Sequence, residues 1–239
     1  QPHPASARPA FPGWRAVFWA VGSGLLLALH FVLWFASLRL TSVASSVVLV
    51  TMQPLFVFAG SYVWLREGPR PGQLLWGAVA LAGGILVGWG DFRLAGTAMQ
   101  GDILAFAAAA MVAGYWLVGR NLRRNLGVLP YTAWVYTAAA LCLLVYASAA
   151  GQPLLGYPAA DWWLFLGLAV VPTLFGHTLF NWSLRYVSAG TVSVSVLVEP
   201  LGATLLGWLI LDEAPSALQL WGGALLLAGL VQFQRAQDP

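Results

Sequence analysis

Glu199 is the residue of this sequence best suited to chemistry inside an apolar environment. It lies near the centre of a long apolar run and is followed by Pro200. A charged side chain at the centre of a membrane span costs at least about 2.5 kcal/mol on insertion scales, so such residues usually face a cavity or a partner. Pro200 removes a backbone donor and frees a carbonyl one turn earlier. We expect Glu199 to contact a substrate amine, to couple protons, or to be a protonated structural residue bonded to a neighbouring helix.

His177 is placed by its spacing at the same depth as Glu199. The turn between their two apolar runs centres near Ser188, which is 11 residues from each. Two antiparallel helices joined by a tight turn put both side chains about 16 Å from it. A histidine–carboxylate pair there is suited to relaying a proton, although a histidine bonded to a backbone carbonyl is an equally ordinary interpretation. Asn181 is one turn from His177 on the same helix face.

The first half of the chain contains a similar arrangement without the charged residue. His30 and Gln53 flank an earlier turn at nearly equal distances, and Gln53 occupies the position that matches Glu199. Tyr115 and Trp116 are candidates for an aromatic wall, or for packing against lipid and other helices. We therefore expect an asymmetric site, with its charge in one half only.

The composition identifies the environment of these residues. Of 239 residues, 60% are hydrophobic and 8% are charged, whereas a soluble domain carries about 25% charged residues. The apolar residues fall in blocks of about 20, the length that spans about 30 Å of hydrocarbon. The chain is thus expected to be an all-α integral membrane protein with the lipid bilayer as its partner.

Several other classes are disfavoured by residue usage. All eleven basic residues are arginines and are scattered, so no nucleic acid partner is expected. Cys142 is the only cysteine, which excludes disulfides and thiolate metal sites within the chain. His3, His30 and His177 are too far apart to form a histidine-rich metal site, and we expect neither a metal nor another cofactor.

Eight membrane spans are predicted, separated by short polar segments. They cover about 15–38, 43–64, 73–90, 102–119, 129–149, 162–184, 189–210 and 218–234.

Arginine is distributed unevenly between the two sides of these spans. One side collects nine arginines and the other only two, Arg39 and Arg93. Because short cytoplasmic loops are enriched in arginine, both ends of this chain are expected in the cytoplasm. The expected location is a bacterial-type inner membrane, crossed several times, with the C-terminus cytoplasmic.

The sequence also repeats itself at an offset of 146 residues. Residues 37–84 align without gaps to 183–230, with 18 identities in 48 positions. The copies begin five spans apart, so they run through the membrane in opposite directions. Inverted repeats of this kind are common in secondary transporters, whose two halves rock about a midplane site.

The two copies are unequal in length. We expect residues 1–14 to be a loop or a truncated start, 15–90 to be a first repeat that lacks its first two helices, and 102–235 to be a second repeat of five helices. The eight visible helices then belong to a ten-helix protein of five plus five.

A recurring motif resembles a known family. It runs Pro54-Leu55, Leu65-Arg66-Glu67 and Gln73-Leu74-Leu75-Trp76-Gly77-Ala78, and again Glu199-Pro200-Leu201, Leu211-Asp212-Glu213 and Gln219-Leu220-Trp221-Gly222-Gly223-Ala224. This is similar to the EamA family of the drug/metabolite transporter superfamily. The resemblance implies a ten-helix permease with a central cavity and with small metabolites as substrates, often amino acids or related compounds.

The function expected from these features is secondary transport of a small metabolite, such as an amino acid or an amine, by alternating access. No ATP-binding motif is present, so energy would come from an ion gradient or from the gradient of the substrate. The chain is not expected to be an enzyme. The alternatives are a non-transporting structural membrane subunit and, less favoured, a membrane enzyme.

Overall fold

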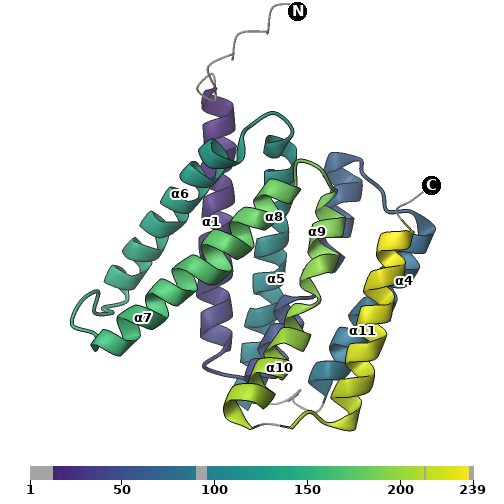
Figure 1. Cartoon of the computed structure of the whole chain (residues 1–239). Coiled ribbons are helices and arrows are strands. Elements are labelled where there is room, and N and C mark those ends of the chain that lie inside the picture. The colour runs from purple at the N-terminus through teal and green to yellow at the C-terminus, as the bar shows by residue number, and fades with distance from the viewer. Residues whose placement is uncertain (1–12, 90–95, 213, 237–239) are drawn as a thin grey trace, which may run out of the picture.

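The chain folds into a bundle of apolar helices (Figure 1). This computed structural model describes residues 13–89, 96–212 and 214–236. Within these residues, 8 helical spans are long and apolar enough to cross a membrane, which confirms the all-α membrane fold. The predicted start segment 1–14 lies almost wholly outside the described residues, as do Arg93 and Glu213 of the analysis above.

The helices are, in chain order, α1 (Trp14–Ser37), α2 (Val43–Val50), α3 (Gln53–Gly60), the π-helical η1 (Ser61–Leu65), α4 (Pro71–Gly88), α5 (Gly96–Arg123), α6 (Val128–Ala149), α7 (Ala159–Leu168), the π-helical η3 (Ala169–His177), α8 (Thr178–Ser183), α9 (Ala189–Val196), α10 (Glu199–Leu211) and α11 (Ala217–Arg235).

Three spans are less regular than the sequence suggests. The spans predicted at 43–64 and 189–210 are each broken in the middle, between α2 and α3 and between α9 and α10. The span at 162–184 passes through η3, which contains Pro172. Proline lacks an N–H and cannot complete the regular α-helical ladder, so the backbone takes a wider turn there.

The repeat is reproduced in the backbone at the same offset of 146. α2 and α9 have equivalent limits, and α3 and α10 both start at the equivalent positions Gln53 and Glu199. The hydroxyls of Ser42 and Ser188 each accept a hydrogen bond from a backbone N–H of the first turn that follows, which is the usual role of an N-cap serine. This recurrence gives the chain the inverted-repeat fold.

The ends of the two equivalent helical stretches also match. Arg66 and Asp212 are the only non-glycine residues with positive φ in the described chain, at 55° and 57°. In each copy the next helix begins a few residues later, and the amide oxygens of Gln73 and Gln219 accept hydrogen bonds from the backbone ahead of it. The same local devices therefore end and restart the helix in both halves.

α4 and α11, which are equivalent in the two copies, pack against each other closely. A Cβ added to Gly229 would lie 2.5 Å from the Ala80 nitrogen, and one added to Gly222 would lie 2.8 Å from the Val87 nitrogen. Small residues allow this approach of two backbones. Gly88, near the end of α4, faces the side chain of Val48 in α2 instead.

α5 connects polar groups at both ends of the bundle. Near its start the Asp102 carboxylate accepts hydrogen bonds from Thr41 and Ser45, at 2.7 and 2.8 Å. Near its end Arg120 and Arg124 form ion pairs with Glu67, at 3.0 and 2.6 Å. The helix runs from Gly96 to Arg123, beyond the predicted limits of 102 and 119.

α7 and η3 run obliquely across the front of the bundle in Figure 1 and pack loosely. Neither contains a buried residue. α1, their equivalent in the first copy, lies against α5 and α6.

Candidate functional site

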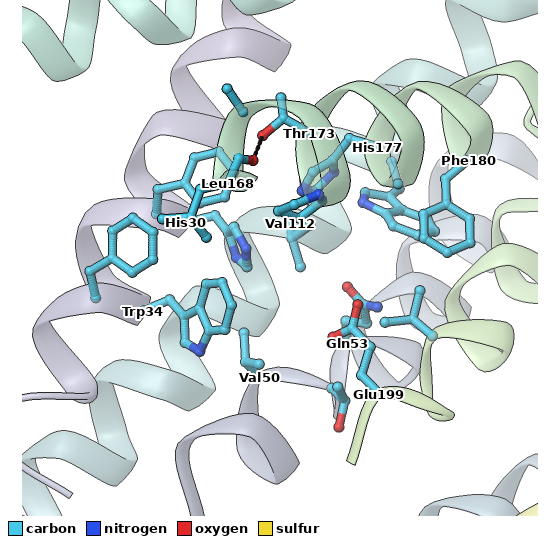
Figure 2. A pocket seen from close by; sticks show the side chains of 18 of the residues that line it. His30, Trp34, Val50, Gln53, Val112, Leu168, Thr173, His177, Phe180 and Glu199 are labelled. Atoms are coloured by element: carbon cyan, nitrogen blue, oxygen red, sulfur yellow. Dashed lines mark hydrogen bonds between the residues drawn. The ribbon is translucent and has the colours of Figure 1, made fainter. Parts of the chain in front are cut away.

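A cavity of about 400 Å³ lies among the middles of the spans. Its wall is formed by α1, α5, α6, α7, η3 and α8, and by the two helix breaks at α2–α3 and α9–α10. Figure 2 shows side chains from these elements arranged around the space. The cavity therefore lies where the two inverted copies meet.

The helix breaks bring Gln53 and Glu199 to one side of the cavity. Both begin a helix and are followed by a proline, Pro54 or Pro200. A proline in the first turn lacks only a donor that would be unsatisfied there in any case, so the break is the natural start of each helix. Figure 2 shows the polar ends of Gln53 and Glu199 close together and directed into the cavity.

The side chains of Gln53 and Glu199 form no hydrogen bond or ion pair with other described residues. Gln53 is 3% exposed, whereas Glu199 is exposed although it lies near the middle of the span Ala189–Ile210. Within the described part of the chain, no hydrogen bond or ion pair involves either side chain. The neighbouring-helix bond considered for a structural Glu199 is thus absent from the described residues, and the carboxylate faces an open space.

His30 and His177 also line the cavity. The Nδ1 of His30 lies 3.0 Å from the Ala108 carbonyl oxygen, the ordinary carbonyl-bonded state of an intramembrane histidine. Among the described residues, the Nδ1 of His177 has no hydrogen-bond partner. The structure brings Glu199 and the histidines to one cavity but forms no hydrogen bond between them, so the proposed proton relay stays a prediction.

Aromatic rings make up much of the remaining wall. The rings of His30 and Trp34 stack at 5.8 Å, and Phe31 meets His177 edge-on at 5.7 Å. The rings of Trp116 and Phe180 lie 5.3 Å apart. Of this group the sequence analysis named Trp116 and the histidines.

Trp34, Phe31 and Phe180 were missed by sequence reasoning. A signal was present for α1, where His30, Phe31, Trp34 and Phe35 follow a helical spacing that places all four on one side of the helix. In so apolar a span this pattern resembles ordinary packing.

Asn181 and Tyr115 do not reach the cavity wall. Asn181 is 1% exposed, and its amide nitrogen donates hydrogen bonds to the hydroxyls of Tyr115 and Tyr136, at 2.5 and 3.3 Å. The ring of Tyr115 meets that of His177 edge-on at 5.9 Å. These two predicted site residues are hydrogen-bonded to each other and lie behind the residues that line the cavity.

Among the described residues that line the cavity, Glu199 is the only acidic side chain and there is no arginine. The chain contains no lysine, since all eleven basic residues are arginines. In the described residues no three histidine, cysteine or acidic side chains lie together in a way that would hold a metal ion.

Taken together, the fold and the cavity define a multi-pass helical membrane protein built from an inverted repeat. The sequence pattern of the EamA-like transporter family matches residues 4–89 and 99–233. The chain belongs to that family, as the recurring motif indicated.

Individual proteins of known sequence agree with this assignment. The chain is 23% identical to the uncharacterized transporter YdfC of Bacillus subtilis over 76% of its own length and 59% of YdfC. It is 25% identical to the pseudopaline exporter CntI of Pseudomonas aeruginosa, over 90% of this chain and 74% of CntI. The chain thus spans about 59% of the length of YdfC.

The fold also matches a protein of known crystal structure. The two chains superpose with a TM-score of 0.74 and share 21% sequence identity, and the match covers 95% of this chain and 82% of the other. The likeness establishes the fold.

Proposed function

We propose that this protein is a secondary transporter that moves a small metabolite, such as an amino acid or an amine, across the membrane by alternating access. The observation that carries the proposal is an unpaired carboxylate, Glu199, in a cavity at the meeting point of two inverted copies. Inverted-repeat transporters bind their substrates near the midplane, where helices are discontinuous. Membership of a transporter family supports the same function.

Each helix break supplies a site at which one half can move relative to the other. At α2–α3 and α9–α10 two residues interrupt the helix, and the following proline cannot donate to the carbonyl one turn earlier. Irregular backbone at this depth is tolerated where it lines a cavity. Both breaks border the cavity, so a change in the tilt of α3 or α10 would open one end of it and close the other.

Glu199 is proposed to bind the substrate amine or to carry the coupling proton. An ionised carboxylate without a partner at this depth is costly, so it should hold either a proton or a cation at most times. If a proton and a cationic substrate bind Glu199 in turn, their exchange would link substrate movement to a proton gradient. A purely structural subunit would have no use for an accessible, unpaired carboxylate in its interior.

The orientation is also a proposal. α1 begins and α11 ends at the same end of the bundle (Figure 1), and the arginine-bearing contacts of Glu67 lie in the loop before α4 and at the end of α5. We place this arginine-rich end, with the C-terminus, in the cytoplasm of a bacterial-type cell and the chain in its inner membrane.

The function is tested by a thermal-shift screen of the purified full-length protein against a few hundred metabolites. Wild type is compared with Glu199→Gln and with Asp212→Asn, a control that removes a carboxylate from the other end of α10 in a left-handed position that asparagine tolerates. A ligand at one hundred times its Kd stabilises the folded state by about 2.7 kcal/mol.

The expected result is that one chemical class raises the melting temperature of wild type and of Asp212→Asn but not of Glu199→Gln. If ligands stabilise all three proteins equally, solute binding stands and the assigned role of Glu199 is wrong. A folded protein that responds to no compound would count against the transporter proposal and in favour of the structural subunit.

A further inference from the structure

The charges around the cavity restrict what it can hold. In the part of the chain that the structure describes, Glu199 faces the space without a partner and no arginine lines it; the sequence contains no lysine. A ligand carboxylate would therefore share a volume of about 400 Å³ with a second carboxylate and meet no fixed positive charge. Burying an uncompensated charge is strongly unfavourable, so an anionic group on the ligand is rejected.

The two histidines in the wall are not expected to supply a positive charge. The ring of His30 is bonded to the Ala108 carbonyl and stacked on Trp34. That of His177 is enclosed edge-on by Phe31 and Tyr115. Both rings are packed among apolar side chains away from water, and burying a charged imidazolium in such surroundings is costly, so neither ring is expected to receive a ligand carboxylate as a cation.

The N–H groups of the two indole rings in the wall are buried. The Nε1 atoms of Trp34 and Trp116 are buried without a hydrogen-bond partner in the described residues, so they are not accessible from the cavity. These two side chains present ring surface to a ligand, and aromatic faces attract cations within about 6 Å of the ring centroid.

The size of the space suits one small molecule. A volume of about 400 Å³ is near the lower end of the range of ligand pockets, which is about 300 to 1,000 Å³. The wall is mostly apolar, and Gln53 and Glu199 lie close together on one side of it (Figure 2). Of the other polar groups in the wall, His30, Thr51 and Thr173 already contact backbone carbonyl oxygens. Such a site fits a flat apolar body with a single polar end.

We propose that the cavity selects organic monocations, an aromatic or similarly flat apolar group bearing one amine, over amino acids of the same skeleton. This inference rests on the proposed transport function and narrows its substrate class. The amine lies beside Glu199 and Gln53, and the ring lies among Phe31, Trp34 and Phe180.

The experiment compares four compounds that share the indole ring and carry different charged groups. Tryptamine is a monocation and tryptophan carries an additional carboxylate. Tryptophan methyl ester has similar bulk to tryptophan and is a monocation when the buffer is more acidic than the pKa of its amine, which sets the assay pH, and indole-3-propionate is an anion. Dissociation constants are measured by calorimetry on the purified full-length protein. We expect tryptamine and the ester to bind at least about tenfold more tightly than tryptophan, because a buried group without a partner is rejected by a binding site.

Exchanging the residues at the equivalent positions 53 and 199 tests whether the carboxylate itself, and not another effect of substitution, causes the preference for monocations. Glu199→Gln should remove the preference for the monocations, and Asp212→Asn should leave it unchanged. Because Gln53 lies beside Glu199 in the cavity, the double variant Gln53→Glu/Glu199→Gln restores one carboxylate and should recover the preference. Each variant is checked for a single gel-filtration peak and a cooperative melting transition.

The outcomes separate this inference from the function on which it rests. Tryptophan or indole-3-propionate binding as tightly as tryptamine would overturn the selectivity for monocations and leave the transporter proposal intact. Equal preference in wild type and Glu199→Gln would overturn the role of the carboxylate. A folded wild type that binds none of the four compounds would contradict the monocation proposal, whereas the metabolite screen described above decides the transport function independently.

Discussion

At the scale of single residues, Glu199 and Gln53 have equivalent positions and different chemistry. Both start a helix before a proline and point into the same cavity. The first copy places a neutral amide where the second places a carboxylate, so the cavity holds one negative group instead of two facing each other. Like charges at such a distance would oppose ionisation of both, and a single carboxylate avoids this conflict.

Asn181 has a structural role in this account. Its amide donates to the hydroxyls of Tyr115 and Tyr136 while the residue is 1% exposed. Asn181→Leu removes these donors and should lower the free energy of unfolding in detergent by about 1–3 kcal/mol, measured by thermal or denaturant unfolding.

The control for Asn181 is Asn125→Ala, an exposed position just after α5. It should leave stability unchanged. Because Asn181 lies outside the cavity wall, Asn181→Leu should also preserve the ligand selectivity of whatever protein remains folded. A loss of selectivity without a loss of stability would place Asn181 in the binding site instead.

At the scale of elements, the break between α9 and α10 sets the position of Glu199. Pro200→Ala supplies the missing N–H and allows α9 to continue into α10. We expect a higher melting temperature, because one backbone hydrogen bond is gained, and ligand binding weakened at least about tenfold, because a small misplacement of a binding group is costly.

The prediction for Pro200→Ala is tested by measuring the melting temperature and the ligand affinity of the same preparation. Pro153→Ala, in the loop between α6 and α7, is the control and should change neither quantity appreciably. If Pro200→Ala binds ligand as the wild type does, then the helix break does not position the carboxylate.

The contact of α4 with α11 gives a second prediction for elements. A Cβ on Gly229 would lie 2.5 Å from the Ala80 nitrogen, whereas one on Gly22 of α1 would meet nothing within 4 Å. Gly229→Ala should therefore destabilise the protein by about 1–3 kcal/mol, the usual cost of overpacking. Gly22→Ala should be neutral or stabilising by up to about 1 kcal/mol, because alanine favours a helix.

Unfolding of the two glycine variants in detergent tests this directly. Equal stability of Gly229→Ala and Gly22→Ala would mean that α4 and α11 are further apart than described.

The sequence predicted the elements better than their irregularities. The eight spans follow from hydropathy, and the inverted repeat follows from matched Pro, Glu, Gln and Gly positions. Pro200 indicated a freed carbonyl, but the two-residue break before Glu199 depends on how α9 and α10 pack. Likewise, the helical spacing put His177 and Asn181 on one face. That the amide of Asn181 is hydrogen-bonded to Tyr115 and Tyr136 depends on how other helices pack, which the spacing does not show.

At the scale of the whole molecule, the arginine distribution predicts sidedness. The only cysteine, Cys142, lies within α6, so Cys142→Ala gives a background free of thiols. In that background Gln152→Cys places a thiol in the exposed α6–α7 loop, and Tyr186→Cys places one in the exposed turn after α8. These positions lie at opposite ends of the bundle (Figure 1).

A membrane-impermeant maleimide added to intact cells should label the Gln152→Cys protein and spare the Tyr186→Cys protein. Both should react once the cells are opened. The reverse pattern would invert the orientation and move the C-terminus out of the cytoplasm.

The central claim is that a substrate crosses the membrane through the cavity that contains Glu199. The most direct measurement is counterflow in proteoliposomes of the full-length protein, with the fixed cation N,N,N-trimethyltryptammonium and with tryptophan. We expect saturable exchange of the cation by wild type and Asp212→Asn, and a reduction of at least about tenfold in Glu199→Gln. Exchange of neither solute above protein-free liposomes, or equal exchange by wild type and Glu199→Gln, would contradict the claim.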